Sequence, residues 1–71
     1  MKPRKQAVRH LRKAGFVFKR SGGNHDIYYN EQTACIIPLK RHDFDEDDLR
    51  YIDKEIASLA KRADGGKEGN R

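Results

Sequence analysis

Apolar residues first recur at helical spacing near the start of the chain, with Lys and Arg between them. These residues are Ala7, Val8, Leu11 and Ala14. Pro3 suits the first turn of a helix, where its missing N–H costs nothing, and Gly15 is typical of the position just past a helix end. The pattern therefore predicts a basic amphipathic helix over residues 3–14.

Three short segments then carry the aromatic and β-branched residues that favour strands, at residues 16–20, 25–29 and 34–39. The turns between them are short and consist of glycine or polar residues, which predicts sequential hairpins and an antiparallel sheet. Pro38 removes a backbone donor from the third segment, so we expect that strand to lie at an edge of the sheet or to end there.

A second amphipathic helix is predicted to begin at Asp45, the expected N-cap, with Asp48 placed to complete a capping box. The acidic residues 45–48 suit the positive end of the helix dipole, and this explains them better than a metal site does. An apolar stripe follows them, formed by Leu49, Ile52, Ile56 and Leu59. Residues 63–71 have little to bury and are expected to form a disordered tail.

The order of these elements predicts a single α+β domain, α-β-β-β-α, over residues 1–62. Both helices have an apolar stripe to cover, so we expect them on one face of a three-stranded antiparallel sheet. The opposite face or the rim of the sheet is then open to a partner. No repeat or linker divides the chain, which is short enough for one domain only.

The charge is distributed unevenly, and this favours a polyanion as a partner. The net charge is +5: residues 1–41 hold ten basic and two acidic residues, and residues 42–71 hold six basic and nine acidic ones. A basic first part of this kind is typical of a surface that faces nucleic acid. Uneven charge on an ordinary surface is the alternative.

The rest of the composition narrows the possibilities. The single cysteine, Cys35, excludes an internal disulfide and a four-cysteine zinc site. No apolar run approaches the length of a membrane span, and no secretory signal is recognised, so we expect a cytoplasmic protein without membrane contact. The histidines at positions 10, 25 and 42 lack ligand spacing, so we expect no metal and no other cofactor.

His25 is the sharpest candidate for chemistry, because it follows the flexible turn at residues 21–24 and can lie at the rim of the sheet. A histidine can take or give a proton near neutral pH. RNA carries its own nucleophile, the 2′-OH, so a ribonuclease needs only a base, an acid and charge stabilisation at the phosphate. Taken by itself, a histidine after a Gly-Gly turn is more often an ordinary surface or packing residue.

Residues around His25 are candidates for contact with RNA. Backbone N–H groups at Gly22 and Gly23 can approach a phosphate, and nearby cations can pair with it. The full candidate set is Lys19, Arg20, Gly22, Gly23, Asn24, Tyr28, Lys40 and Arg41. Tyr28 and Tyr29 point to opposite faces of the sheet, so one can stack a base while the other fills the core. The alternatives are a tight hairpin for the glycines, solvated cations, and one core tyrosine beside one surface tyrosine.

The order and spacing of these segments resemble the HicA mRNA interferase toxins over about residues 4–60. The matching stretches are Lys-Ala-Gly-Phe at 13–16, Phe-Lys-Arg-Ser-Gly-Gly-Asn-His-Asp-Ile-Tyr at 18–28, Ile-Ile-Pro-Leu at 36–39, and the second helix. The most specific part is Gly23-Asn24-His25, placed between the first two strands. Asn24 stands where the family commonly has Ser, and the segment after the third strand is more acidic than usual.

The resemblance implies a fold like that of double-stranded-RNA-binding domains and metal-independent cleavage of mRNA, with His25 as the catalytic residue. It also implies a HicB-like antitoxin that covers the site. On this basis we expect an endoribonuclease toxin in the bacterial cytoplasm. Two alternatives stay open. One is a non-catalytic RNA-binding module of the same fold, whose affinity a His25→Ala change leaves intact. The other is a protein-interaction subunit that binds an acidic partner instead of RNA.

Overall fold

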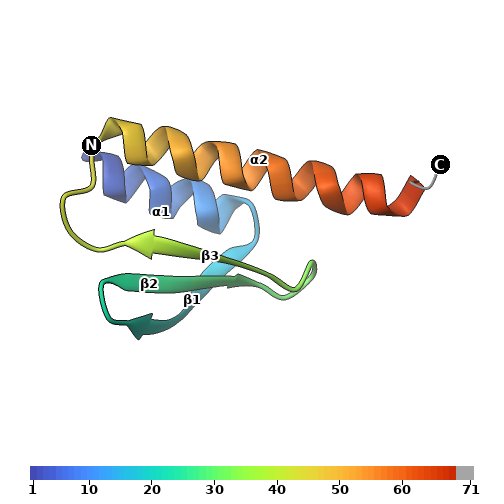
Figure 1. Cartoon of the computed structure of the whole chain (residues 1–71), viewed down its shortest axis with the longest axis horizontal. Helices are drawn as coiled ribbons and strands as arrows, with labels where there is room; N and C mark the ends of the chain where they lie inside the picture. Colours follow the sequence, from blue (N-terminus) through green and yellow to red (C-terminus); the bar gives the residue numbers. More distant parts are fainter. Residues whose placement is uncertain (69–71) are drawn as a thin grey trace.

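The computed structural model describes the backbone of residues 1–68 and the side chains of residues 1–61. Five elements follow one another, which confirms the expected α+β class and element order. Their bounds are α1 Pro3–Lys13, β1 Phe16–Gly22, β2 His25–Asn30, β3 Cys35–Lys40 and α2 Glu46–Glu68. Figure 1 shows α1 and α2 side by side over one face of the sheet, with α1 contacting β1 and α2 contacting β3. The opposite sheet face is open.

α1 begins at Pro3, as expected, and buries Ala7 and Leu11 completely. The chain then enters β1 through Gly15, whose φ is +97°. A Cβ at this position would lie 3.1 Å from the amide nitrogen of Asn30. Both the backbone conformation and the close approach therefore require glycine at the end of α1.

The sheet has the order β1-β2-β3, with antiparallel pairing throughout. The register of β1 shifts between Phe18 and Arg20, so Lys19 forms a β-bulge. The bulge exchanges the faces to which the following residues of β1 point. As a result Arg20 lies opposite Ile27, and Gly22 lies opposite His25, on the open face of the sheet.

The core lies between the sheet and the two helices. It consists of Ala7, Leu11, Phe16, Tyr28, Ile37, Leu39 and Ile52. Pro38 is exposed on β3, which among the described residues pairs with β2 alone and so lies at an edge of the sheet, as one of the two expectations had it; the strand does not end at Pro38 but runs on to Lys40. The core is small, and the burial of these side chains against both helices accounts for the two-layer arrangement.

α2 begins with the expected capping box. Asp45 Oδ1 accepts from the backbone N–H groups of Asp47 and Asp48 at 3.0 and 3.1 Å, and Asp48 Oδ2 accepts from the N–H of Asp45 at 3.0 Å. α2 then runs to Glu68, past residue 62, where the sequence analysis ended the folded domain. Extending a helix costs far less than nucleating it, which explains this continuation. The last part of the expected tail, residues 69–71, lies outside the described residues.

In the described part of the chain, neither helix carries an apolar stretch long enough to cross a bilayer.

Candidate functional site

His25 is the first residue of β2, at the end of the sheet where the β1–β2 turn, the end of β3 and the starts of both helices come together (Figure 1). It is exposed, and its register partners are Gly22 on β1 and Lys40 on β3. The two-residue connection between Gly22 and His25 keeps this hairpin end tight. The fold therefore places an accessible imidazole beside a lysine at the rim of the sheet.

A polar hollow of ≈380 Å³ lies on one side of His25. It is lined by Asn24, His25, Lys40, His42 and Asp43. We call it the polar hollow. Two histidines and a lysine thus line the same space together with Asp43, and histidines beside a lysine can supply acid–base chemistry on a phosphate.

The loop between β3 and α2 brings His42 into this hollow. The backbone N–H of Arg41 donates to the carbonyl of Asn24 at 3.0 Å, which joins the loop to the β1–β2 turn. Asp43 then has a φ of 55°, a left-handed conformation that is uncommon outside glycine. The sequence analysis gave His42 no catalytic role, because no local signal in the sequence predicts this reversal.

A second, mostly apolar hollow of ≈120 Å³ lies on the other side of His25. It is lined by His25, Pro38, Lys40, Phe44, Asp48, Tyr51 and Ile52. We call it the apolar hollow. Lys40 and His25 line both hollows, and Lys40 Nζ donates to Asp48 Oδ2 at 3.3 Å. The hydrogen bond from the backbone N–H of Asp45, helped by Lys40, holds the pKa of Asp48 below its usual range, so this carboxylate is ionised at neutral pH.

Asp26 ties the elements around the site together on the helix-facing side of the sheet. Its Oδ2 accepts from Arg4 Nη2 at 2.7 Å, and its Oδ1 accepts from Ser21 Oγ at 3.0 Å. Arg41 Nε lies 3.5 Å from the same Oδ1, and Arg41 Nη1 donates to the carbonyl of Gly23 at 3.1 Å. We call these contacts the Asp26 network. Through these contacts the Arg41 guanidinium group joins the end of β3 to the β1–β2 turn on the helix-facing side of the sheet.

The open face next to His25 carries two further cations that the sequence analysis selected. Arg20 Nη1 lies 3.3 Å from the point that a Cβ on Gly22 would occupy, so the absence of a side chain there leaves room for the guanidinium group. Lys19 places its ammonium nitrogen 4.5 Å from the ring centroid of Tyr29. Both cations are exposed and lie on the same sheet face as His25.

Tyr28 requires a correction. The sequence analysis placed it among the residues that contact RNA, but its ring is only 8 % exposed and belongs to the core. Its ring centroid lies 6.0 Å from that of Phe18 in an edge-to-face arrangement. Alternation along a strand shows that Tyr28 and Tyr29 face opposite ways, but not which face the helices cover. Tyr29 is the tyrosine on the open face.

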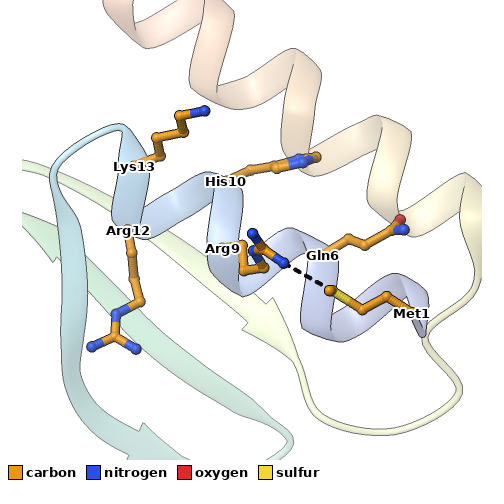
Figure 2. A pocket seen from close by; sticks show the side chains of 6 residues that line it. All are labelled: Met1, Gln6, Arg9, His10, Arg12 and Lys13. Atoms are coloured by element: carbon orange, nitrogen blue, oxygen red, sulfur yellow. Dashed lines mark hydrogen bonds between the residues drawn. The ribbon is translucent and has the colours of Figure 1, made fainter.

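A larger hollow of ≈670 Å³ runs along α1 and does not include His25. It is lined by Met1, Gln6, Arg9, His10, Arg12 and Lys13. Figure 2 shows Arg12 and Lys13 extending away from each other, so this is an open basic surface rather than an enclosed site. His10 turns toward α2, where its Nδ1 lies 2.7 Å from Asp53 Oδ1.

The cations of α1 are largely unpaired. Of the lysines and arginines near or within the helix, only Arg4 makes an ion pair with a described acidic side chain. Those without such a pair in the described part of the chain are Lys2, Lys5, Arg9, Arg12 and Lys13. α1 contains no acidic residue at all. The outward side of α1 is therefore a strongly positive surface.

Among the residues with described side chains, no group of three or more His, Cys, Asp or Glu is placed to hold a metal ion.

The sequence model of the HicA toxins of bacterial toxin–antitoxin systems matches residues 4–63. That span contains α1, the whole sheet, both hollows and the first part of α2. No curated protein and no solved structure matches the chain significantly.

Proposed function

The chain belongs to the HicA toxin family of bacterial toxin–antitoxin systems, and we propose that it is an endoribonuclease toxin whose acid–base chemistry is carried out by His25 and His42. The observation that carries this proposal is the polar hollow, which His25, His42 and Lys40 line together. His25 is the residue that the sequence analysis selected, and His42 supplies the second proton-transfer group that it did not identify.

The reaction uses the 2′-OH of the RNA as its nucleophile. One imidazole takes the proton from the 2′-OH while the 2′-oxygen forms a bond to the adjacent phosphorus. The P–O5′ bond breaks, and the other imidazole, protonated beforehand, gives its proton to the leaving O5′. The products are a 2′,3′-cyclic phosphate and a 5′-OH. This step needs two proton-transfer groups and positive charge at the phosphate, and no nucleophilic side chain or metal ion.

Cations on the open face stabilise the phosphate in this proposal. Lys40 lies opposite His25 in the register, and Arg20 extends beside Gly22, the other register partner of His25. The backbone N–H groups of Gly23 and Asn24 in the turn are further donors for the phosphate oxygens. The charge that develops in the transition state is thus surrounded by donors from three strand ends.

The unpaired cations of α1 hold the rest of the RNA. Free surface charges attract a polyanion over a distance of about 10 Å at moderate salt. Contacts to phosphates carry no sequence information, so this surface binds RNA without reading it. A cognate HicB-like antitoxin would inhibit the toxin by covering the open face around His25, and acidic residues on it would pair with the same cations.

The test is cleavage of a labelled RNA by the purified chain in EDTA, comparing wild type with single histidine variants. We expect His25→Ala to lose about 10² to 10⁴ in kcat/KM and His42→Ala to lose a comparable factor. His10→Ala is the matched control, because His10 lies on α1, bonds to Asp53 and lines neither the polar nor the apolar hollow.

Normal cleavage by His25→Ala would sink the proposal. Normal cleavage by His42→Ala alone would remove His42 from the chemistry and leave His25 in place. Cleavage of a substrate with a 2′-deoxyribose at the cut position would contradict the use of the 2′-OH. Circular dichroism of each variant separates a loss of chemistry from a loss of fold.

A further inference from the structure

The apolar hollow differs from the polar hollow in the kind of residues that line it. The polar hollow is lined by polar side chains only, whereas here a proline ring, two aromatic rings and an isoleucine lie beside His25, Lys40 and Asp48. Tyr51 is 60 % exposed and stands on the outer edge. An apolar recess with an aromatic edge beside a phosphate site suits the flat face of a nucleobase.

Besides Lys40, this hollow holds the Asp48 carboxylate, which suits the amino group of a base better than a phosphate. Asp48 is ionised, and a carboxylate repels a phosphate oxygen while it accepts hydrogen bonds from a base edge. Its Oδ2 is occupied by the Asp45 N–H and by Lys40 Nζ, at 3.0 and 3.3 Å. Its Oδ1 has no hydrogen-bond partner among the described residues. The capping box and Lys40 therefore fix the carboxylate in place and leave one oxygen available as an acceptor.

The size of the hollow restricts the base. An apolar cavity of about 150 Å³ takes one benzene ring, and this hollow measures ≈120 Å³. The hollow is smaller than that cavity but is open on the side of the exposed Tyr51, so one ring of a base can enter it, and the second ring of a purine would remain outside. Between the two single-ring bases, cytosine presents an amino group at N4, whereas uracil presents a carbonyl oxygen at the same position. Only the amino group can donate to the free oxygen of Asp48.

From these observations we infer that the apolar hollow is a subsite for a cytosine next to the cleaved bond, with Asp48 accepting from its N4 amino group and Tyr51 stacking on its ring. This inference rests on the proposed ribonuclease activity and gives it a sequence preference. The cations of the open face and of α1 read no sequence, so the preference comes from this one base. Asp48 is thus a specificity-determining residue, and the hydrogen bond from the Asp45 N–H at the start of α2 orients its carboxylate.

The experiment uses uridine oligonucleotides that carry one cytidine, adenosine or guanosine at a central position, with cleavage sites mapped and rates measured. We expect wild type to cut next to cytidine about tenfold faster than next to uridine at the same position. Asp48→Asn should bring the two rates to within about twofold, because an amide can both donate and accept. Asp47→Asn is the matched control. Asp47 is the neighbour of Asp48 and carries the same charge, but its side chain does not line the hollow, so this variant should keep the tenfold preference.

Tyr51→Ala tests the stacking wall. It should lower cleavage next to both cytidine and uridine about tenfold, because stacking is shared by the two bases. Tyr51 is largely exposed, so this change leaves the fold intact. Tyr51→Phe keeps the ring and should behave as wild type.

The outcomes separate this inference from the proposed function. Equal cutting at all four bases, or a preference that survives Asp48→Asn, overturns the cytosine subsite and leaves the ribonuclease intact. If wild type cuts no oligonucleotide, the ribonuclease proposal fails, and the subsite is then judged by binding of the same oligonucleotides to His25→Ala, measured by fluorescence anisotropy. Equal affinity for the cytidine and uridine versions in that measurement overturns the subsite as well.

Discussion

The central strand β2 carries one polar side chain at each end of its helix-facing side, and the two ends differ in kind. At one end Asn30 is 5 % exposed, donates through Nδ2 to the carbonyl of Ala14 at 3.1 Å, and accepts through Oδ1 from the N–H groups of Gln32 and Thr33 at 2.9 and 3.2 Å. At the other end Asp26 retains 16 % side-chain exposure and carries a charge.

The two ends differ in what their contacts hold in place: parts of the fold at one end, and the candidate site at the other. The Asn30 amide is neutral and buried, and it joins α1 to the β2–β3 turn with bonds to the backbone only. Asp26 instead pairs with Arg4 and Arg41, whose side chains reach the β1–β2 turn and the end of β3. One end of the sheet thus specifies the fold, and the other end positions the residues around His25.

Removing the Asn30 side chain should give the largest loss of stability. Asn30→Ala leaves the Ala14 carbonyl and two turn N–H groups without partners and opens a space behind them. We expect the free energy of unfolding to fall by about 2–4 kcal/mol, measured by urea denaturation. Asn24→Ala, at an exposed asparagine in the other turn, should change it by less than about 0.5 kcal/mol. A loss below about 1 kcal/mol for Asn30→Ala would contradict the structural role.

Two glycine substitutions sharpen the same comparison. Gly15→Ala combines a φ of +97° with a Cβ placed 3.1 Å from the Asn30 amide, whereas Gly23 has a φ of +59° and nothing within 4 Å of its Cβ position. We expect Gly15→Ala to cost about 2 kcal/mol and Gly23→Ala about 1 kcal/mol. Thermal unfolding of both variants measures the difference, and a larger cost at Gly23 would reverse the assignment of the two ends.

Asp26→Asn should weaken the site more than the fold. The amide keeps an acceptor for Arg4 but loses the charge that holds Arg41, so we expect a loss of about 1 kcal/mol in stability. Because the β1–β2 turn is then held less firmly, cleavage should fall about tenfold. Asp53→Asn is the control, since Asp53 is paired with His10 away from both hollows. Wild-type cleavage by Asp26→Asn would show that the network does not position the site.

The smallest expected effect is a loss of stability at low pH. The pKa of Asp48 lies below its ordinary value of 3.8, mainly because of the hydrogen bond from the Asp45 N–H. A carboxyl group whose pKa is lowered by folding adds stability at pH values above its pKa in the unfolded protein. This contribution is lost as the pH falls through its pKa in the folded protein. Wild type should therefore lose thermal stability below pH 3.8 more steeply than Asp48→Asn. Identical pH profiles for the two proteins would contradict this.

The sequence predicts the fold well because its signals are local. Helical spacing, the Asp45 capping box and Pro38 at the edge each depend on residues within one element, and the structure confirms them. The bulge at Lys19 has no local signal, since it depends on how β1 pairs with β2. The extent of α2 beyond residue 62 is also not marked, because helix propagation overrides a composition that suits a tail.

The candidate site is only partly predictable from the sequence, because some of its residues are brought together by contacts between elements. His25 and Lys40 lie together because hairpins bring strand ends into register, and this follows from the order of the strands. His42, Asp48 and Tyr51 join them only through the turn after β3 and the packing of α2 on the sheet, both of which are tertiary. Sequence reasoning therefore selects candidates on the sheet, such as His25 and Lys40, but not the residues after β3 that line the same hollows.

The most direct test of the central claim is inducible expression of wild type, His25→Ala and His10→Ala in a bacterium, following growth and mRNA integrity together. The account predicts growth arrest with loss of mRNA for wild type and His10→Ala, and normal growth with intact mRNA for His25→Ala, at equal protein levels. Arrest and mRNA loss with His25→Ala, or no effect of wild type on either readout, would contradict it.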